Sequence, residues 1–240
     1  IIYKGTKVKK ILQIFVIWEN GRTLENKIMQ DIAAKYDILQ TFTISWPAAE
    51  FAQNLSRFYG KKIPAGCKKE KECGTGAFTL IVGYDNNPNM VKDSHHPEQK
   101  SNYNAIRDKN LYRQWTGGGY LVHASDNSAE AAENLLFILG MSQREIEENY
   151  SARPSGEKIT LTQSMIGANG WSSLDELKGF VAKLPDTRLQ NSDNGLVITT
   201  SDFAKTSRLL NLKKRFKLFK KNEYIAVIGG QSCNILMKAA

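Results

Sequence analysis

The chain is poor in cysteine, and its longest apolar run is too short to cross a membrane. Three cysteines in 240 residues, an odd number, argue against a disulfide scaffold and for a reducing compartment, so we expect a cytoplasmic protein. The longest apolar run, ILQIFVIW, has eight residues, whereas a membrane helix needs ~20. No basic head followed by an apolar segment marks a signal peptide. We therefore expect no membrane span.

Metal ligands are scarce as well. Cys67 and Cys73 stand in CKKEKEC, where five lysines and glutamates separate them. A zinc knuckle usually has about two to four intervening residues and a second ligand pair, so free thiols in a loop are favoured. His95 and His96 are adjacent and cannot easily face one metal ion, which favours a solvated polar loop over residues 86–102. The sequence therefore predicts no metal site.

What the chain has in excess is positive charge. Its formal net charge is +9, and 41% of its residues are hydrophobic, enough for packed cores. Such a protein attracts anions, which include nucleotides, phosphosugars, nucleic acid and an anionic membrane surface. The sign of the charge alone does not indicate which of these anions is the ligand. The first residue is Ile1 rather than methionine, so we expect processing or a cloned fragment.

The first 150 residues alternate between strand and helix patterns. β-branched and aromatic runs predict strands, and apolar spacing of three and four predicts helices. The strands are expected at 8–20, 37–46, 77–85 and 120–123, and the helices at 23–36, 47–60, 103–115, 128–139 and 141–150. Asn127 suits the cap of the helix at 128–139, with Glu130 three residues on. This is the ferredoxin-like βαββαβ order with one extra helix after the second strand.

A smaller α+β domain is expected after a linker near residue 153. We expect the first domain to span 1–152 and the second 153–240, so the fold class is α+β. In the second, a helix over 171–184 is capped by Ser172 or Ser173 with Glu176. Its remaining elements are strands at 187–192 and 196–201, a helix at 202–212, a hairpin at 215–230 and a last strand at 233–239.

His123 is the candidate for chemistry. It ends a short apolar strand, and a helix with free amide groups, which favour a nearby anion, begins a few residues later. A neutral imidazole facing such a helix end suits a phosphoryl acceptor or a general base. We expect the ring to stand exposed in a positively charged hollow. The alternative is a strand-end histidine whose ring is satisfied by a backbone carbonyl.

The segment VHASDNSAEAAENLLFIL resembles the active-site segment of nucleoside diphosphate kinases, where a strand ends in His-Gly-Ser-Asp-Ser and leads into a helix. The matching residues are His123, Ser125, Asp126, Ala131 and either Ser128 or Glu130, while Ala124 replaces the glycine. AEFAQNLSRFYG, FTLIVGYDNN and NAI with a following arginine resemble other parts of that family. The element order agrees over residues 8–140.

The resemblance implies a ferredoxin-like fold and transfer of a phosphoryl group through the histidine. His123 is then the nucleophile and Tyr59 lies beside it at the phosphates. Arg113, or else Arg107, holds the phosphates, because a planar guanidinium grips phosphate oxygens in pairs. The hydroxyl groups of Thr116 and Ser125 complete the expected phosphate site.

Three departures from the family pattern change this expectation. The position of the family's lysine, at the end of the first strand, falls near Trp18 in this chain. Tyr120 replaces the family's asparagine, and Asn134 replaces the glutamate that orients the histidine. Losing an orienting carboxylate should reduce the nucleophilicity of the ring. Glu19 and Arg22 could take the part of the missing lysine, or they are exposed charges of a turn. We therefore expect a related phosphoryl or phosphosugar transfer, or a catalytically inactive nucleotide-binding protein.

The C-terminal residues carry a fainter resemblance, to the nucleotidyltransferase fold. NSDNG and TTSDF suggest it, but Asp193 and Asp202 are isolated, whereas that fold holds magnesium with paired carboxylates. A degenerate or truncated version is the expectation. By analogy of fold pairing, such a combination suits enzymes that build phosphate-containing surface polysaccharides.

A competing function is nucleic-acid binding. The basic segment 212–224, with Phe216 and Phe219 among its lysines, could bind single strands through charge and stacking. A solvated strand edge protected by lysines is favoured over it. The partner we expect is a nucleotide or phosphosugar, with Mg²⁺ only if that ligand is a nucleoside triphosphate, and a homo-oligomer is left open.

Overall fold

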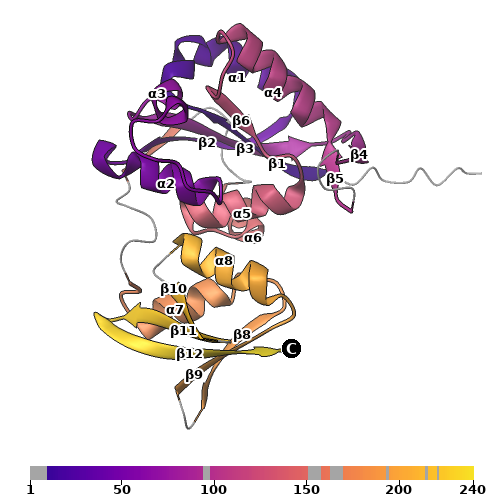
Figure 1. Cartoon of the computed structure of the whole chain (residues 1–240). Coiled ribbons are helices and arrows are strands. Elements are labelled where there is room, and N and C mark those ends of the chain that lie inside the picture. Colours follow the sequence, from indigo (N-terminus) through magenta and orange to yellow (C-terminus); the bar gives the residue numbers. More distant parts are fainter. Residues whose placement is uncertain are drawn as a thin grey trace, which may run out of the picture.

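The computed structural model describes residues 10–93, 98–150, 158–162, 170–192, 195–213, 216–220 and 222–240. Figure 1 shows two sheets with their own helices, one above the other. The upper sheet contains β1 (Ile11–Ile17), β2 (Asp37–Ser45), β3 (Phe78–Asp85), β6 (Val122–Ala124) and β7 (Lys158–Thr162). The lower sheet contains β8 (Thr187–Ser192), β9 (Gly195–Thr200), β10 (Phe216–Lys220), β11 (Glu223–Ile228) and β12 (Gln231–Ala239).

The upper sheet has the strand order β6-β1-β3-β2-β7. The pairs β6–β1, β1–β3 and β3–β2 are antiparallel, which is the ferredoxin-like arrangement, so the predicted α+β fold class is confirmed. β7 then pairs parallel to β2 and extends the sheet. The sequence assigned residues 158–162 to the C-terminal domain, whereas they complete the N-terminal sheet here. The division of the chain at residue 153 itself stays a prediction.

Helices cover both faces of the upper sheet (Figure 1). One face carries α1 (Glu25–Lys35) and α4 (Tyr103–Trp115), and the other carries α2 (Phe51–Phe58), α5 (Ser128–Leu139) and α6 (Gln143–Tyr150). Because side chains alternate along a strand, β1 feeds two cores. Phe15 and Ile17 pack towards α1 and α4, whereas Ile14 and Val16 pack towards α5. We call these the α1/α4 face and the α2/α5 face.

The lower sheet has the strand order β10-β11-β12-β9-β8 and carries α7 (Leu174–Val181) and α8 (Phe203–Lys213). Ser173 caps α7 by accepting a hydrogen bond from the Glu176 amide at 3.1 Å, as the sequence predicts. α8 lies between the lower sheet and α5 (Figure 1). Arg208 of α8 forms an ion pair with Glu133 of α5, so the two sheets are joined through these helices.

α3 (Lys68–Cys73) and the strand pair β4 (Met90–Lys92) and β5 (Lys100–Asn102) lie where the sequence predicts loops. Two 3₁₀ helices are also present: Glu19–Leu24 spans the predicted turn between the first strand and the first helix, and Ala48–Glu50 lies at the start of the helix predicted over 47–60. α3 has no apolar stripe for a pattern to detect, because its buried residues are only Glu70 and Cys73. His95 and His96 lie outside the described residues. None of the described helices is long and apolar enough to cross a bilayer.

Candidate functional site

His123 lies at the centre of β6, paired in register with Val16 of β1. Its neighbours Val122 and Ala124 pack on the α1/α4 face, so the imidazole projects towards α2 and α5. There the rings of Phe58 and Tyr59 meet it edge-on, with centroids 5.0 and 5.6 Å away. His123 is only 6% exposed, so the prediction of an exposed ring is wrong. The cause is that the aromatic end of α2 closes over β6.

One nitrogen of the ring is oriented by α5. Nε2 of His123 lies 3.4 Å from the amide nitrogen of Asn134 and 3.7 Å from a carboxylate oxygen of Glu130. Residues four apart share one face of a helix, and Asn127 starts this helix by accepting a hydrogen bond from the Glu130 amide at 2.9 Å. Within the part of the chain that is described, Nδ1 of His123 has no hydrogen-bond partner.

Three cations lie around His123, and we call Lys69, Lys109 and Arg113 the cation cluster. Burial, together with the charges of Lys109, Arg113 and Lys69, holds the pKa of His123 well below its ordinary value of 6.5. Lys109 and Arg113 stand four residues apart on α4, and Lys69 belongs to α3. The imidazole is therefore neutral at neutral pH, the form in which a ring nitrogen is nucleophilic.

The members of the cation cluster differ in their partners. Lys109 forms an ion pair with Asp126 at 2.5 Å, and Nε of Arg113 donates to the carbonyl of Val122 at 2.8 Å. Among the described residues, no carboxylate lies within ion-pair distance of Arg113 or Lys69. This part of the molecule therefore carries positive charge that the protein itself does not neutralise, and such charge favours an anion.

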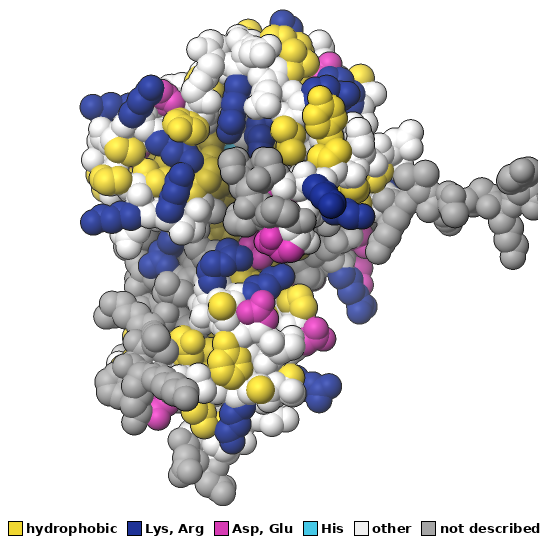
Figure 2. Space-filling model, turned by 45° about the vertical axis from the view of Figure 1, so that its right-hand side comes forward, with side chains coloured by type: hydrophobic (Ala, Val, Ile, Leu, Met, Phe, Trp, Pro, Cys, Tyr) yellow, Lys and Arg dark blue, Asp and Glu magenta, His cyan; other side chains and the backbone are white. Residues whose placement is uncertain are grey.

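Lys69 is held by aromatic rings in place of an acid. Its ammonium group lies 3.1 Å from the ring centroid of Tyr59 and 4.7 Å from that of Tyr120. Burial, followed by the charge of Lys61, lowers the pKa of Lys69 to about 8. A negatively charged ligand beside Lys69 would raise the pKa of Lys69, which is opposite to the effect of Lys61. Figure 2 shows lysine and arginine side chains spread over this part of the upper unit.

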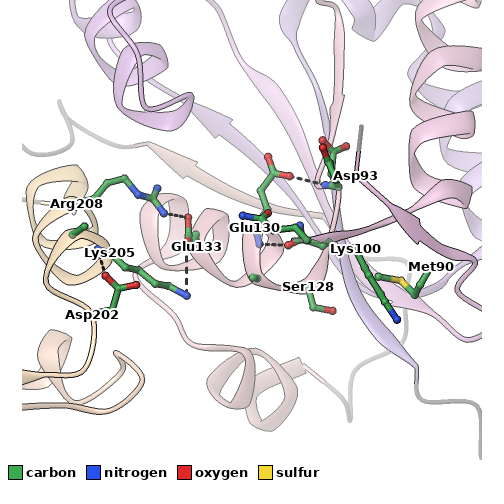
Figure 3. A pocket seen from close by; sticks show the side chains of 14 residues that line it. Met90, Asp93, Lys100, Ser128, Glu130, Glu133, Asp202, Lys205 and Arg208 are labelled. Atoms are coloured by element: carbon green, nitrogen blue, oxygen red, sulfur yellow. Dashed lines mark hydrogen bonds and ion pairs between the residues drawn. The ribbon is translucent and has the colours of Figure 1, made fainter. Parts of the chain in front are cut away.

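A small cavity lies on the α5 side of His123. Its volume is about 160 Å³, and its lining comprises Phe58, Tyr59, Gly60, Glu130, Glu133, Asn134, Phe137 and Arg208. Burial raises the pKa of Glu130, which contacts the imidazole. A larger cavity of about 950 Å³ opens between α5 and α8. Figure 3 shows Arg208 and Lys205 of α8 extending across it towards Glu133.

Three of the predicted phosphate ligands are engaged elsewhere. Arg107 donates two hydrogen bonds, at 2.9 and 3.2 Å, to the carboxylate of Asp108 on the α1/α4 face. The hydroxyl of Thr116 donates within its own helix, to the carbonyl of Tyr112 at 2.9 Å. Ser125 is fully buried, and its hydroxyl accepts a hydrogen bond from the amide of Ile14 at 3.0 Å. The structure does not bring these side chains to a ligand at His123.

The residues expected to replace the missing lysine serve the end of β1. Glu19 accepts a hydrogen bond from the amide of Gly76 at 2.6 Å. Arg22 donates to Glu25 at 2.9 Å and to the carbonyl of Ala77 at 3.2 Å. Trp18 is fully buried among aromatic rings. These contacts hold a turn together, and neither charge faces His123.

Sequence reasoning missed two members of the cation cluster. Lys109 precedes Arg113 by four residues on a predicted helix, so their shared face was a signal in the sequence. Lys69 had none, because the segment around it was expected to be a loop. Of the basic segment 212–224, residues 214, 215 and 221 lie outside the described residues. In the part of the chain that is described, no three His, Cys, Asp or Glu side chains come together as a metal site.

Comparisons with known proteins give little beyond the topology. No protein-family model and no curated protein matches the chain. Among solved structures, a nucleoside diphosphate kinase from Aquifex aeolicus matches with a TM-score of 0.38 and 14% identity, over 57% of this chain and 99% of that chain. This is a weak similarity, and the C-terminal residues have no counterpart in it. A function for this chain therefore has to be inferred from the geometry of the site alone.

Proposed function

We propose that the protein binds the phosphate groups of a nucleotide or phosphosugar at the cation cluster, and that His123 accepts a phosphoryl group from this ligand. The observation that supports the proposal is a neutral, oriented imidazole beside Lys69 and Arg113, two cations without a carboxylate partner among the described residues. Cations of this kind stabilise the charge that develops on a transferring phosphoryl group.

The step is a substitution at phosphorus. The reacting tautomer carries its proton on Nε2, on the side of the Glu130 carboxylate, and requires the Asn134 amide to turn its oxygen rather than its nitrogen towards the ring. The lone pair of Nδ1 then forms a bond to the terminal phosphorus of the donor while the bond from phosphorus to the bridging oxygen breaks. The electron pair of that bond stays on the departing phosphate, where Lys69 and Arg113 offset its charge. The imidazole becomes positive, and Glu130, 3.7 Å from Nε2, is the carboxylate placed to stabilise it. Reversal with another acceptor completes the transfer.

We expect Mg²⁺ at the site only when it is bound to the phosphates of a nucleoside triphosphate. Such a donor binds Mg²⁺ through its own phosphates. The described residues form no cluster of three ligands that would hold the ion, so no step of the proposed reaction runs through it. A role in surface polysaccharide synthesis likewise stays a prediction.

The second candidate is a protein that binds a nucleotide without transferring phosphate. It is favoured by the burial of His123, which is 6% exposed, and by the lack of a carboxylate in normal hydrogen-bond contact with the ring among the described residues. The two candidates share the ligand site and differ in whether His123 becomes covalently modified.

The test is labelling with nucleoside triphosphates carrying a labelled terminal phosphate. Transfer predicts a base-stable, acid-labile label that is absent from the His123→Ala and His123→Gln variants, with unfolding curves showing that both are folded. Asn134→Glu restores a carboxylate beside Nε2 and should speed labelling, whereas the exposed control Glu148→Gln should leave it unchanged. A wild-type protein that acquires no label from nucleoside triphosphates or phosphosugar donors contradicts transfer.

A further inference from the structure

A second positively charged hollow lies between α2 and α8, and we call it the basic cleft. Its volume is about 470 Å³, within the range of small-molecule sites. It is lined by Arg57, Lys61, Lys62 and Arg208, together with Gln53, Ser56 and Gly60. All four charged lining residues that the structure describes are therefore cations, and they come from both halves of the chain.

The loop that carries two of these cations is fixed. The hydroxyl of Ser56 accepts a hydrogen bond from the amide of Ile63 at 2.8 Å and donates to the carbonyl of Ala52 at 2.7 Å. The amide of Lys61 donates to the carbonyl of Ser56 at 3.1 Å, and Ile63 is buried in the core. The backbone is thus set before a ligand arrives, which lowers the entropic cost of binding.

The described charges that line the basic cleft all have the same sign. Burial lowers the pKa of Arg57, and Lys61 lowers that of Lys69 in the neighbouring cation cluster. Arg208 pairs with Glu133, which lines the adjoining cavities but not this one. An anion in the cleft would be attracted by the cations of its lining and would compete with Glu133 for Arg208.

We propose that the basic cleft binds a phosphate or diphosphate group at a site separate from His123, and that this anion bridges α2 and α8. Phosphate chemistry is favoured because two guanidinium groups face one space, and each can hold two oxygens of one phosphate. The group belongs to a free ion or to a small molecule such as a nucleoside diphosphate. The proposal does not depend on phosphoryl transfer at His123.

Stabilisation of a helix end is the other use for these cations. Arg57 stands in the last turn of α2, where positive charge interacts favourably with the helix dipole. That use requires neither Arg208 nor Lys62. It predicts that removing Arg57 changes stability alone, whereas the anion site predicts a change in ligand affinity.

The test is calorimetric titration with inorganic pyrophosphate and with a nucleoside diphosphate, at constant ionic strength. It is made in the Lys69→Gln, Arg113→Gln double variant, which removes the two members of the cation cluster that lack a carboxylate partner among the described residues. Binding should survive there and weaken about tenfold on adding Arg57→Gln or Lys62→Gln, the loss expected for one charged hydrogen bond. Glu133→Gln, which removes the competitor for Arg208, should strengthen it. If pyrophosphate and the nucleoside diphosphate bind with equal affinity, the nucleoside part of the ligand contributes nothing to binding.

The matched control is Arg144→Gln on α6, an exposed arginine outside the cleft, which should leave affinity unchanged. Lys62 is exposed, so its variant keeps the test informative if Arg57→Gln unfolds. Pyrophosphate binding that disappears in the Lys69→Gln, Arg113→Gln variant, or that ignores Arg57 and Lys62, overturns the proposal. Neither result bears on labelling of His123, so failure here is distinct from failure of the transfer proposal.

Discussion

Two regions of the upper unit treat charge in opposite ways. Within the α1/α4 face, the buried carboxylate of Asp108 accepts hydrogen bonds from Tyr36 at 2.9 Å, Lys35 at 3.1 Å and Arg107 at 2.9 Å. Around His123 of the edge strand β6, Lys69 of α3 and Arg113 of α4 have no such acid among the described residues.

Charged groups that are paired inside the protein stabilise the fold, whereas cations without an acidic partner favour the binding of an anionic ligand. A satisfied buried network rigidifies a protein, and its loss is a loss of stability. Cations that converge without an acid repel one another, and the fold retains them at some cost. We infer that the Asp108 network is structural and that the region around His123 is the binding region.

The largest expected effect is on the Asp108 network. Asp108→Ala leaves Lys35, Tyr36 and Arg107 without their common acceptor, so we expect a loss of about 3 kcal/mol in the free energy of unfolding. Urea denaturation measures it. Glu148→Gln, which breaks an exposed ion pair with Arg144, is the control and should cost at most about 0.5 kcal/mol. A similar loss in both variants would contradict the structural role of the Asp108 network.

The next effect concerns the pH dependence of stability that His123 causes. Since the pKa of His123 is lowered on folding, the unfolded chain binds a proton below about pH 6.5 that the folded protein does not. Stability should therefore fall with decreasing pH, by up to about 1.4 kcal/mol for each unit below 6.5. Glu130, with its raised pKa, acts in the opposite sense.

Thermal unfolding between pH 7 and pH 5 checks this prediction. The His123→Gln variant lacks the titrating ring, so its profile should be flatter than that of the wild type over this range. Both proteins contain the same cation cluster, so its contribution to the pH dependence of stability cancels when the two profiles are compared. Parallel profiles would mean that His123 takes up its proton freely in the folded state.

The smallest stability effect is expected at Lys69. Lys69→Gln removes a repulsive charge but also a contact with the ring of Tyr59, so stability should change by less than about 1 kcal/mol. Nucleotide affinity should fall at least fivefold, and the pKa of His123 should rise because one nearby positive charge is gone. Calorimetry and NMR titration measure these changes. A variant with unchanged affinity and reduced stability would assign Lys69 to the structural class.

Most of the architecture is specified by local patterns. The apolar run of β1 and the cap at Asn127 are visible in the sequence, and both appear as expected. α3 is different, because a helix of six mostly charged residues forms only where Glu70 and Cys73 find a buried environment. The placement of β7 beside β2 is a non-local pairing, which no local pattern specifies.

The site was predicted less well than the fold. Tyr59 and Asn134 contact His123, and their roles at a ligand stay predictions. The burial of the ring depends on Phe58 closing over it, a packing outcome that spacing does not determine. Ser125 matched a motif, yet its hydroxyl serves the backbone of β1, because a motif match identifies a residue and not its hydrogen-bond partner.

The central claim is that an anion binds beside His123 at Lys69 and Arg113. The most direct measurement is an NMR titration of the His123 ring with and without inorganic pyrophosphate. A bound anion offsets the positive charges that lower the pKa of His123, so the account predicts that pyrophosphate raises this pKa, and that Lys69→Gln with Arg113→Gln abolishes the change. A pKa of His123 that is identical with and without saturating pyrophosphate would contradict the account.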